Sequence, residues 1–152
     1  MWDRFWQSID QANKLCLVTT YDMDHKMVAG ITLHKMINAL ERGVVCVLII
    51  DDLNYYASRI EAEKFEKAGG VLIRNNLFRE SASHIMSGKW RLIFNRNHQK
   101  AMLVDDKVFI GSFNVADPYT DDNYGVHTFR DVSVCVKMKH TRSVADFFIN
   151  IL

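Results

Sequence analysis

The chain has 152 residues, 49% of them hydrophobic, and its 19 basic and 18 acidic side chains leave a formal net charge of +1. This length and hydrophobic fraction indicate one compact domain over residues 1–152, and the near balance of charge excludes a whole-molecule field that would attract nucleic acid. The longest apolar run, residues 44–50, is much shorter than the roughly 20 residues that span a bilayer, so we expect no transmembrane segment.

The first predicted element is an amphipathic helix at the amino terminus. Its apolar stripe follows i, i+3, i+4, i+7 spacing and consists of Trp2, Phe5, Trp6 and Ile9. An aromatic stripe of this kind suits either a membrane interface or a protein core. We favour the core, because the polar face of the helix carries acidic residues, which disfavour anionic lipid.

Three strands are predicted in the first half of the chain. They lie at residues 15–20, 44–50 and 71–74. The second run is apolar throughout, which is typical of a fully buried parallel strand. Between these strands, one helical stripe ends at Gly43 and a further helix is predicted from about residue 54 to residue 67. This alternation of helices and strands predicts an α/β fold.

The second half of the chain predicts a hairpin-rich sheet and a final helix. Apolar runs of strand length lie at residues 91–94, 98–104, 107–111 and 132–137, and the last alternates as a half-buried strand does. Asp105 and Asp106 lie at the tip of a tight turn between the second and third runs. The final helical stripe consists of Val144, Phe147, Phe148 and Ile151. The complete order predicts an α/β sandwich with a mixed sheet.

The chain has three cysteines and no C-x-x-C pair. Cys16, Cys46 and Cys135 all fall in apolar strand-like runs, so we expect buried thiols, a reducing compartment and an intracellular protein. Neither the cysteines nor the histidines show the spacing of metal ligands, and we expect no metal.

The strongest signal is a set of residues spaced as H-x-K-x4-D-x6-G-S-x-N. Its members are His98, Lys100, Asp105, Gly111, Ser112 and Asn114. On a strand, His98 and Lys100 share one face, roughly 6 to 7 Å apart at about 3.3 Å per residue, so both can meet one phosphate. A neutral imidazole is a nucleophile, and a lysine ammonium neutralises charge on a phosphoryl oxygen. The spacing therefore predicts phosphodiester chemistry through a phosphohistidine.

Local charge and the loop after the third run support this interpretation. Residues 74–100 hold six basic residues and one acid. The outer basic residues fit a solvated loop equally well, whereas Arg96 and Lys100 flank the motif and favour phosphate binding. The hydroxyl of Ser112 and the amide of Asn114 could add hydrogen-bond donors to the same phosphate.

The motif resembles the HKD signature of the phospholipase D superfamily. Blocks along nearly the whole chain look like the amino-terminal catalytic half of cardiolipin synthase-type members: residues 15–24, 45–52, 65–76, 95–106, 111–119 and 129–137. The resemblance implies an α/β/α sandwich with a mixed, mostly parallel sheet, and it implies no cofactor. Among the residues of the catalytic motif, it implies that Asp105 supports the site rather than reacting.

The resemblance also implies roles for the other residues. His98 would be the nucleophile or its acid–base partner. Lys100 and Asn114 would bind phosphoryl oxygens, with Ser112 in the same loop. Asp131 matches a position from which a carboxylate orients the catalytic imidazole and fixes its tautomer.

Members of this superfamily combine two such motifs in one active site, and this chain carries one. We therefore expect the second motif to come from a second copy of the chain or from carboxyl-terminal sequence beyond residue 152. The ending within an apolar helical stripe favours missing sequence.

Three functions are compatible with these patterns. We favour a phosphatidyltransferase or phospholipase that acts on glycerophospholipid and contacts a membrane peripherally. The alternative is a homodimeric nuclease of the phospholipase D type, which the basic segment before His98 permits but the net charge of +1 supports little. The third is a catalytically silent module that binds a phosphate group.

Overall fold

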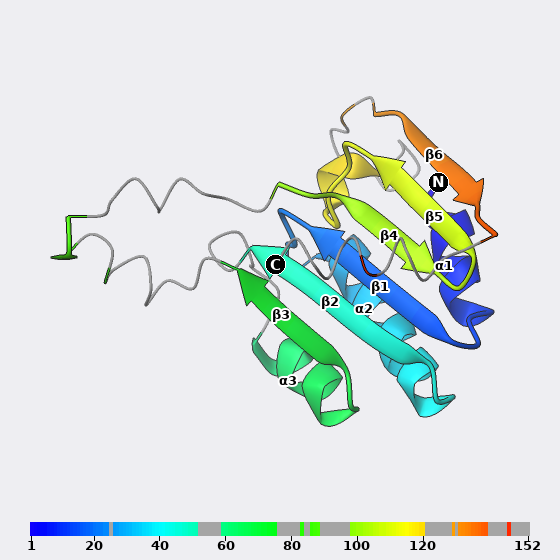
Figure 1. The fold of residues 1–152 in the computed structure, drawn as a ribbon, viewed down its shortest axis with the longest axis horizontal. Helices are drawn as coiled ribbons and strands as arrows, with labels where there is room; N and C mark the ends of the chain where they lie inside the picture. Colours follow the sequence, from blue (N-terminus) through cyan, green and yellow to red (C-terminus); the bar gives the residue numbers. More distant parts are fainter. Residues whose placement is uncertain are drawn as a thin grey trace.

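The computed structural model of the chain describes residues 1–24, 26–51, 59–75, 83, 86–88, 98–120, 129, 131–139 and 146 (Figure 1). Several predictions fall outside these residues. They are the strand at 91–94, the helix at 144–151 and the first residues of the helix expected from about residue 54.

The described strands form one sheet in the order β3-β2-β1-β4-β5-β6 (Figure 1). Their bounds are Leu15–Thr20 for β1, Val45–Asp51 for β2, Val71–Asn75 for β3, Ala101–Val104 for β4, Lys107–Gly111 for β5 and Ser133–Lys137 for β6. Strands β3, β2 and β1 are parallel, whereas β1, β4, β5 and β6 pair in antiparallel fashion. The predicted mixed sheet is confirmed, but its expected mostly parallel character is wrong, because only the β3-β2 and β2-β1 pairs are parallel and the other three described pairs are antiparallel.

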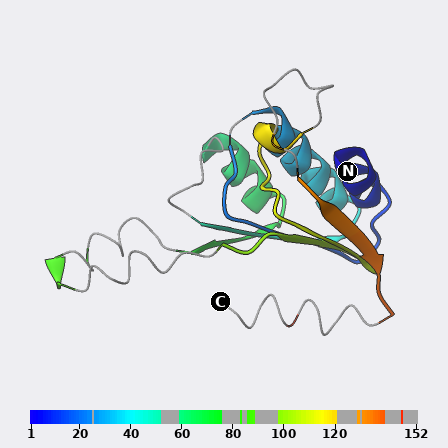
Figure 2. The ribbon, with the colours of Figure 1, turned by 90° about the horizontal axis from the view of Figure 1, so that it is seen from above.

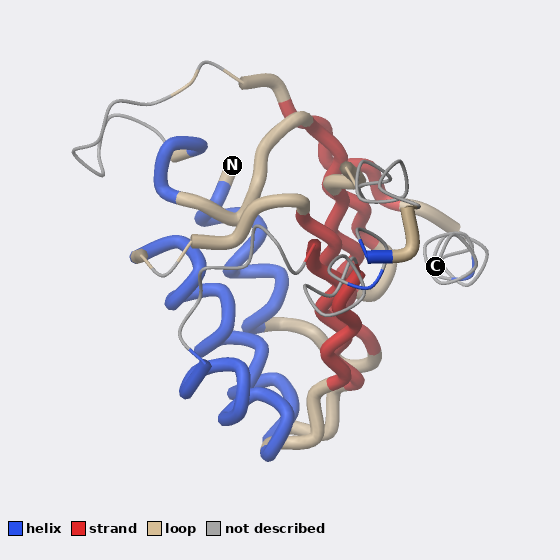
Figure 3. Tube along the Cα trace, turned by 90° about the vertical axis from the view of Figure 1, so that its left-hand side faces the viewer, coloured by secondary structure: helices blue, strands red, loops and turns tan. Residues whose placement is uncertain are grey.

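The described helices cover one face of this sheet (Figures 2 and 3). They are α1 (Trp2–Asp10), α2 (Met27–Glu41), α3 (Arg59–Lys67) and the short 3-10 helix η3 (Asp117–Tyr119). Gly43 lies just after α2 and has a φ angle of 85°. A glycine commonly adopts such a positive φ angle at the carboxyl end of a helix. These layers make the predicted α/β sandwich, whereas the second helical layer of the expected α/β/α arrangement stays a prediction, because the described helices cover one face only.

The aromatic stripe of α1 belongs to the core. Its four members, Trp2, Phe5, Trp6 and Ile9, are buried. The Phe5 ring packs edge-on against Phe109 of β5, with 5.4 Å between the ring centroids. The preference for core packing over a membrane interface is therefore confirmed. In the described part of the chain, no helix combines the length and the apolar character needed to cross a membrane.

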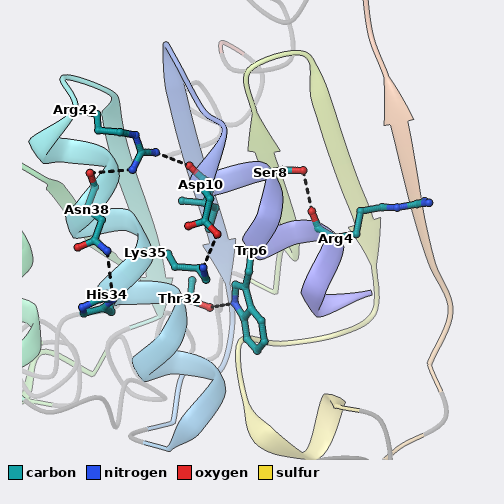
Figure 4. A network of polar contacts seen from close by, with 10 residues as sticks. Arg4, Trp6, Ser8, Asp10, Thr32, His34, Lys35, Asn38 and Arg42 are labelled. Atoms are coloured by element: carbon teal, nitrogen blue, oxygen red, sulfur yellow. Dashed lines mark hydrogen bonds and ion pairs between the residues drawn. The ribbon is translucent and has the colours of Figure 1, made fainter.

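Polar contacts also fix α1 against α2 (Figure 4). The indole Nε1 of Trp6 donates a hydrogen bond to Thr32 Oγ1 at 3.0 Å. Lys35 Nζ lies 2.6 Å from Asp10 Oδ2 at the other end of α1. Because α1 is held against both α2 and β5, its first residue, Trp2, has a fixed position against Phe113 in the loop that follows β5.

The face of the sheet opposite the helices carries a second apolar cluster. Its buried members are Leu17, Val47, Ile49, Ala101, Leu103 and Val108. Strand β6 is confirmed, but its expected half-burial is wrong, because Val134 is 55% exposed and Val136 is 44% exposed at the edge of the described sheet. Cys135 is also exposed, whereas Cys16 and Cys46 are buried as predicted.

Candidate active site

A pocket of about 620 Å³ lies where β1 ends and β4 begins. It is lined by Tyr21, Asp22, His98, Lys100, Gly111, Ser112, Asn114 and Tyr119. The carboxyl ends of the parallel strands and the start of β4 lie at the same end of the sheet (Figure 1). Five members of the predicted motif are therefore brought together in one pocket.

His98 and Lys100 lie in an irregular segment just before β4. The predicted strand begins three residues late, because the antiparallel ladders of β4 with β1 and with β5 both stop at Ala101. Lys100 Nζ lies 3.0 Å from His98 Nδ1 and 3.4 Å from Nε2, and it donates to the His98 carbonyl at 3.2 Å. The two side chains thus meet directly, closer than on a regular strand.

The pKa values of both side chains are shifted downward. Burial lowers the pKa of the His98 imidazole and the positive charge of Lys100 lowers it further, while Asp51 acts in the opposite sense. Burial also lowers the pKa of the Lys100 ammonium, against the carboxylates of Asp131 and Asp22. His98 therefore keeps a neutral ring with a nitrogen lone pair at a lower pH than an ordinary histidine does.

The loop after β5 is held in place by Phe113. This buried ring packs edge-on against Trp2, with 5.6 Å between the centroids. A β carbon at Gly111 would lie 2.5 Å from the Phe113 ring, so a larger residue there would displace the ring. With Phe113 directed into the core, its neighbours Ser112 and Asn114 line the pocket.

Asn114 is buried, and both the oxygen and the nitrogen of its side-chain amide form hydrogen bonds. Its Oδ1 accepts a hydrogen bond from the Asp22 backbone N–H at 3.3 Å, and its Nδ2 donates to Tyr119 Oη at 2.9 Å. Because Nδ2 carries two protons, the contact with Tyr119 leaves donor capacity for a phosphoryl oxygen. Asn114 is thus placed both to bind a phosphate and to hold the segment after β1.

Asp131 lies beside the pocket through its contact with Ser112. Ser112 Oγ donates a hydrogen bond to Asp131 Oδ1. The Asp131 carboxylate also raises the pKa of the Lys100 ammonium, against the larger effect of burial, and thereby favours its charged form. The predicted role of Asp131 in orienting the imidazole stays a prediction.

Asp105 does not reach the pocket. It lies at the opposite end of β4 with a positive φ of 50°. Its carboxylate accepts hydrogen bonds from the backbone amides of Asn13, Lys14 and Leu15 at 2.9, 2.9 and 3.0 Å. This position fits the implied supporting role and contradicts a catalytic one, because the carboxylate fastens the hairpin to the start of β1. Arg96, predicted to bind phosphate, lies outside the described residues.

Three pocket residues were not predicted from the sequence: Tyr21, Asp22 and Tyr119. For the first two a signal existed, because they follow β1 directly, and residues after the carboxyl ends of parallel strands commonly line binding sites. Burial, followed by the charge of Asp24, raises the pKa of the Asp22 carboxyl, while Lys100 lowers it. Tyr119 lines the pocket through its hydrogen bond with Asn114, and no sequence pattern around Tyr119 predicts this tertiary contact.

The family model described as the PLD-like domain of cardiolipin synthase matches residues 5–137. The chain belongs to this family of phospholipase D-like domains. A cardiolipin synthase of Clostridium perfringens is 24% identical to this phospholipase D-like domain over 130 residues, which are 85% of the chain and 26% of the relative. The domain therefore spans about a quarter of the length of that curated relative.

Solved structures show the same fold. Nuc from Salmonella typhimurium, a phospholipase D family member, superposes with a TM-score of 0.61 at 18% identity, over 97% of this domain and 81% of that chain. NucT from Helicobacter pylori gives a TM-score of 0.62 at 14% identity, over 97% of this domain and 84% of that chain. The phospholipase D fold implied by the sequence is confirmed.

Proposed function

We propose that this domain cleaves or transfers the phosphodiester group of glycerophospholipids through a phosphohistidine at His98. The observation that carries the proposal is the 3.0 Å contact between Lys100 Nζ and His98 Nδ1, in a pocket that Ser112 and Asn114 also line. Family membership supports phosphodiester chemistry in general, and the similarity to cardiolipin synthase supports a lipid substrate.

The chemistry has two steps. In the first, the unprotonated ring nitrogen of His98 forms a bond to phosphorus, and the bond between phosphorus and the leaving alcohol oxygen breaks. The Lys100 ammonium and the Asn114 amide stabilise the negative charge on the non-bridging oxygens. In the second step an acceptor hydroxyl bonds to phosphorus and the nitrogen–phosphorus bond breaks. Water as acceptor gives phosphatidic acid, and an alcohol gives a new phosphodiester.

Each step also moves a proton. The leaving oxygen takes up a proton in the first step, and the acceptor hydroxyl loses one in the second. We propose that a second imidazole performs both transfers, supplied by another copy of this domain or by a further half of a longer chain. His98 itself is occupied as the nucleophile and cannot do so.

Two exposed apolar side chains next to the pocket support access to lipid. Phe129 is 62% exposed, and its ring lies 5.4 Å from that of the pocket residue Tyr119. Val132, which follows Asp131, is 81% exposed. Exposed apolar side chains beside a polar pocket are suited to contact with the apolar part of a lipid. We propose peripheral contact with a membrane through this surface.

The substrate is tested with vesicles that contain phosphatidylglycerol. We expect phosphatidic acid or a transfer product from the unchanged protein, loss of several orders of magnitude with His98→Ala, and full activity with the control Lys67→Met on α3. Product formation unaffected by His98→Ala would overturn the proposed chemistry. Metal-independent cleavage of single-stranded DNA with no lipid product would keep the chemistry and overturn the lipid substrate.

The membrane contact is tested separately with Phe129→Ser. We expect weaker sedimentation with vesicles and a lower rate on them, but an unchanged rate on a short-chain lipid below its micelle concentration. An equal rate loss on both substrates would show that Phe129 acts within the pocket instead.

A further inference from the structure

Tyr21 contacts both reactive side chains of the motif. It directly follows β1, 77 positions before His98 in the sequence. Its ring centroid lies 4.4 Å from that of His98, with 48° between the two planes. Lys100 Nζ lies 5.3 Å from the centroid of the same ring. One aromatic ring therefore adjoins the imidazole and the ammonium together.

The backbone on either side of Tyr21 is tied to the loop after β5. Thr20 Oγ1 donates to the Asp22 carbonyl at 2.8 Å and accepts from the Val115 backbone N–H at 3.1 Å. The Asp22 N–H donates to Asn114 Oδ1 at 3.3 Å. These hydrogen bonds fix the backbone before and after Tyr21, so the fold places this residue at the edge of the pocket.

The physical effect of such a ring on its two neighbours is specific. A lysine ammonium within about 6 Å of an aromatic centroid is attracted by the negative face of the ring. The ring also lies against one side of the imidazole, and we expect this contact to add to the desolvation that lowers the pKa of His98. Catalysis depends on geometry held to fractions of an ångström, and a misplacement of about 1 Å can lower a rate roughly 100-fold.

We infer that Tyr21 is a positioning residue, whose ring holds the His98 imidazole and the Lys100 ammonium in the mutual arrangement that phosphoryl transfer needs. Motif residue Asn114 takes part through the hydrogen bond that anchors the Tyr21 segment. The expected effect of Tyr21 on the rate rests on the proposed function. The arrangement of the Tyr21, His98 and Lys100 side chains does not depend on which substrate the domain uses.

The test compares Tyr21→Leu with the conservative variant Tyr21→Phe. Because phenylalanine retains the aromatic face, Tyr21→Phe should keep kcat and the pKa of His98 close to those of the unchanged protein. Tyr21→Leu should lower kcat on phosphatidylglycerol vesicles about 10- to 100-fold with little change in KM. It should also raise the pKa of His98 toward its ordinary value, followed by NMR titration of the imidazole carbon-bound protons.

Two results would overturn the inference. One is a Tyr21→Leu variant with unchanged kcat and an unchanged His98 titration. The other is a Tyr21→Phe variant as impaired as Tyr21→Leu, which would assign the effect to the hydroxyl. If Tyr21→Leu does not fold, NMR contacts between the Tyr21 and His98 rings in the unchanged protein decide, and their absence overturns the inference. The titration needs no turnover, so a failure of the lipid assay alone would refute only the proposed function.

Discussion

At the scale of single residues, the reactivity of this site depends on how Lys100 acts on His98. The ammonium lies within hydrogen-bonding distance of both ring nitrogens, and its positive charge adds to burial in lowering the pKa of the imidazole. The imidazole therefore loses its proton at a lower pH than usual. In the proposed mechanism a phosphoryl oxygen bound beside the ring would meet the same ammonium, so one lysine would both lower the pKa of the nucleophile and bind the substrate.

Replacing Lys100 by methionine tests this electrostatic coupling. Lys100→Met removes a positive charge next to His98, so the pKa of the imidazole should rise, and the pH above which the ring is neutral should rise with it. NMR titration of His98 measures the change directly. Lys67→Met removes a lysine charge on α3 and serves as the matched control. An unchanged or lower pKa of His98 in Lys100→Met would contradict the coupling.

The sequence predicted part of this arrangement. The spacing of the motif was sufficient to expect His98, Lys100, Ser112 and Asn114 around one phosphate, because a hairpin brings residues at the start of its first strand beside residues that follow its second strand. It could not show that Lys100 folds back onto the imidazole, since the strand starts only at Ala101. Tyr21 was missed, because its contact with His98 is formed by pairing of β1 with β4.

At the scale of elements, the β4–β5 hairpin positions the site from both of its ends. The β4 end nearest the pocket carries His98 and Lys100, and β5 leads into Ser112 and Asn114. At the far end, the Asp105 carboxylate fastens the turn to Leu15, the first residue of β1, and to the two residues before it. The motif therefore combines residues that line the pocket with a structural anchor of the sheet that carries them.

The variant Asp105→Asn tests this anchoring role. Asparagine tolerates the left-handed backbone of the turn but lacks the carboxylate charge, so the free energy of unfolding should fall by about 1–3 kcal/mol. Although burial acts in the opposite direction, hydrogen bonds from Leu15, Asn13 and Lys14 hold the pKa of Asp105 below its ordinary value. The contribution should therefore be complete above an unfolded-state pKa of about 3.9 and disappear as pH falls through the lowered folded-state pKa.

Denaturant unfolding measures this difference, with Asp106→Asn as the matched control. Asp106 forms an exposed ion pair with Lys137 at 3.1 Å, so its replacement should cost no more than about 1 kcal/mol. Equal losses in both variants, or a loss in Asp105→Asn that persists at low pH, would argue against the anchor.

The elements themselves were largely predictable, because their apolar periods are clear. Strand β6 shows the limit of that approach. Its alternation predicted a buried valine face, but Val134 and Val136 are exposed, since burial depends on the neighbours at the edge of the sheet and not on the alternation itself.

For the molecule as a whole, the proposed mechanism requires a second imidazole from another domain. The domain covers 26% of a curated cardiolipin synthase but 81% and 84% of the Nuc and NucT chains. The partial coverage of the cardiolipin synthase is compatible with the proposal that a further half of a longer polypeptide completes the active site, and two copies of the domain are the alternative in that proposal.

Mixing experiments separate these arrangements for residues 1–152. The unchanged protein is mixed with His98→Ala protein, and the subunits are allowed to exchange. If two copies form one active site, mixed dimers are inactive, so the activity should fall more steeply than the fraction of unchanged chains. A strictly proportional decrease would show that each chain works alone or with a different partner.

Trapping the covalent intermediate tests the proposed role of His98 as the nucleophile. The reaction with phosphatidylglycerol would be quenched rapidly in base, which preserves phosphohistidine, and the peptides examined by mass spectrometry. We predict a phosphatidyl adduct on the peptide that contains His98, lost in His98→Ala and retained in the control Lys67→Met. If the lipid were turned over without any adduct on His98, and turnover continued in His98→Ala, His98 would not be the nucleophile.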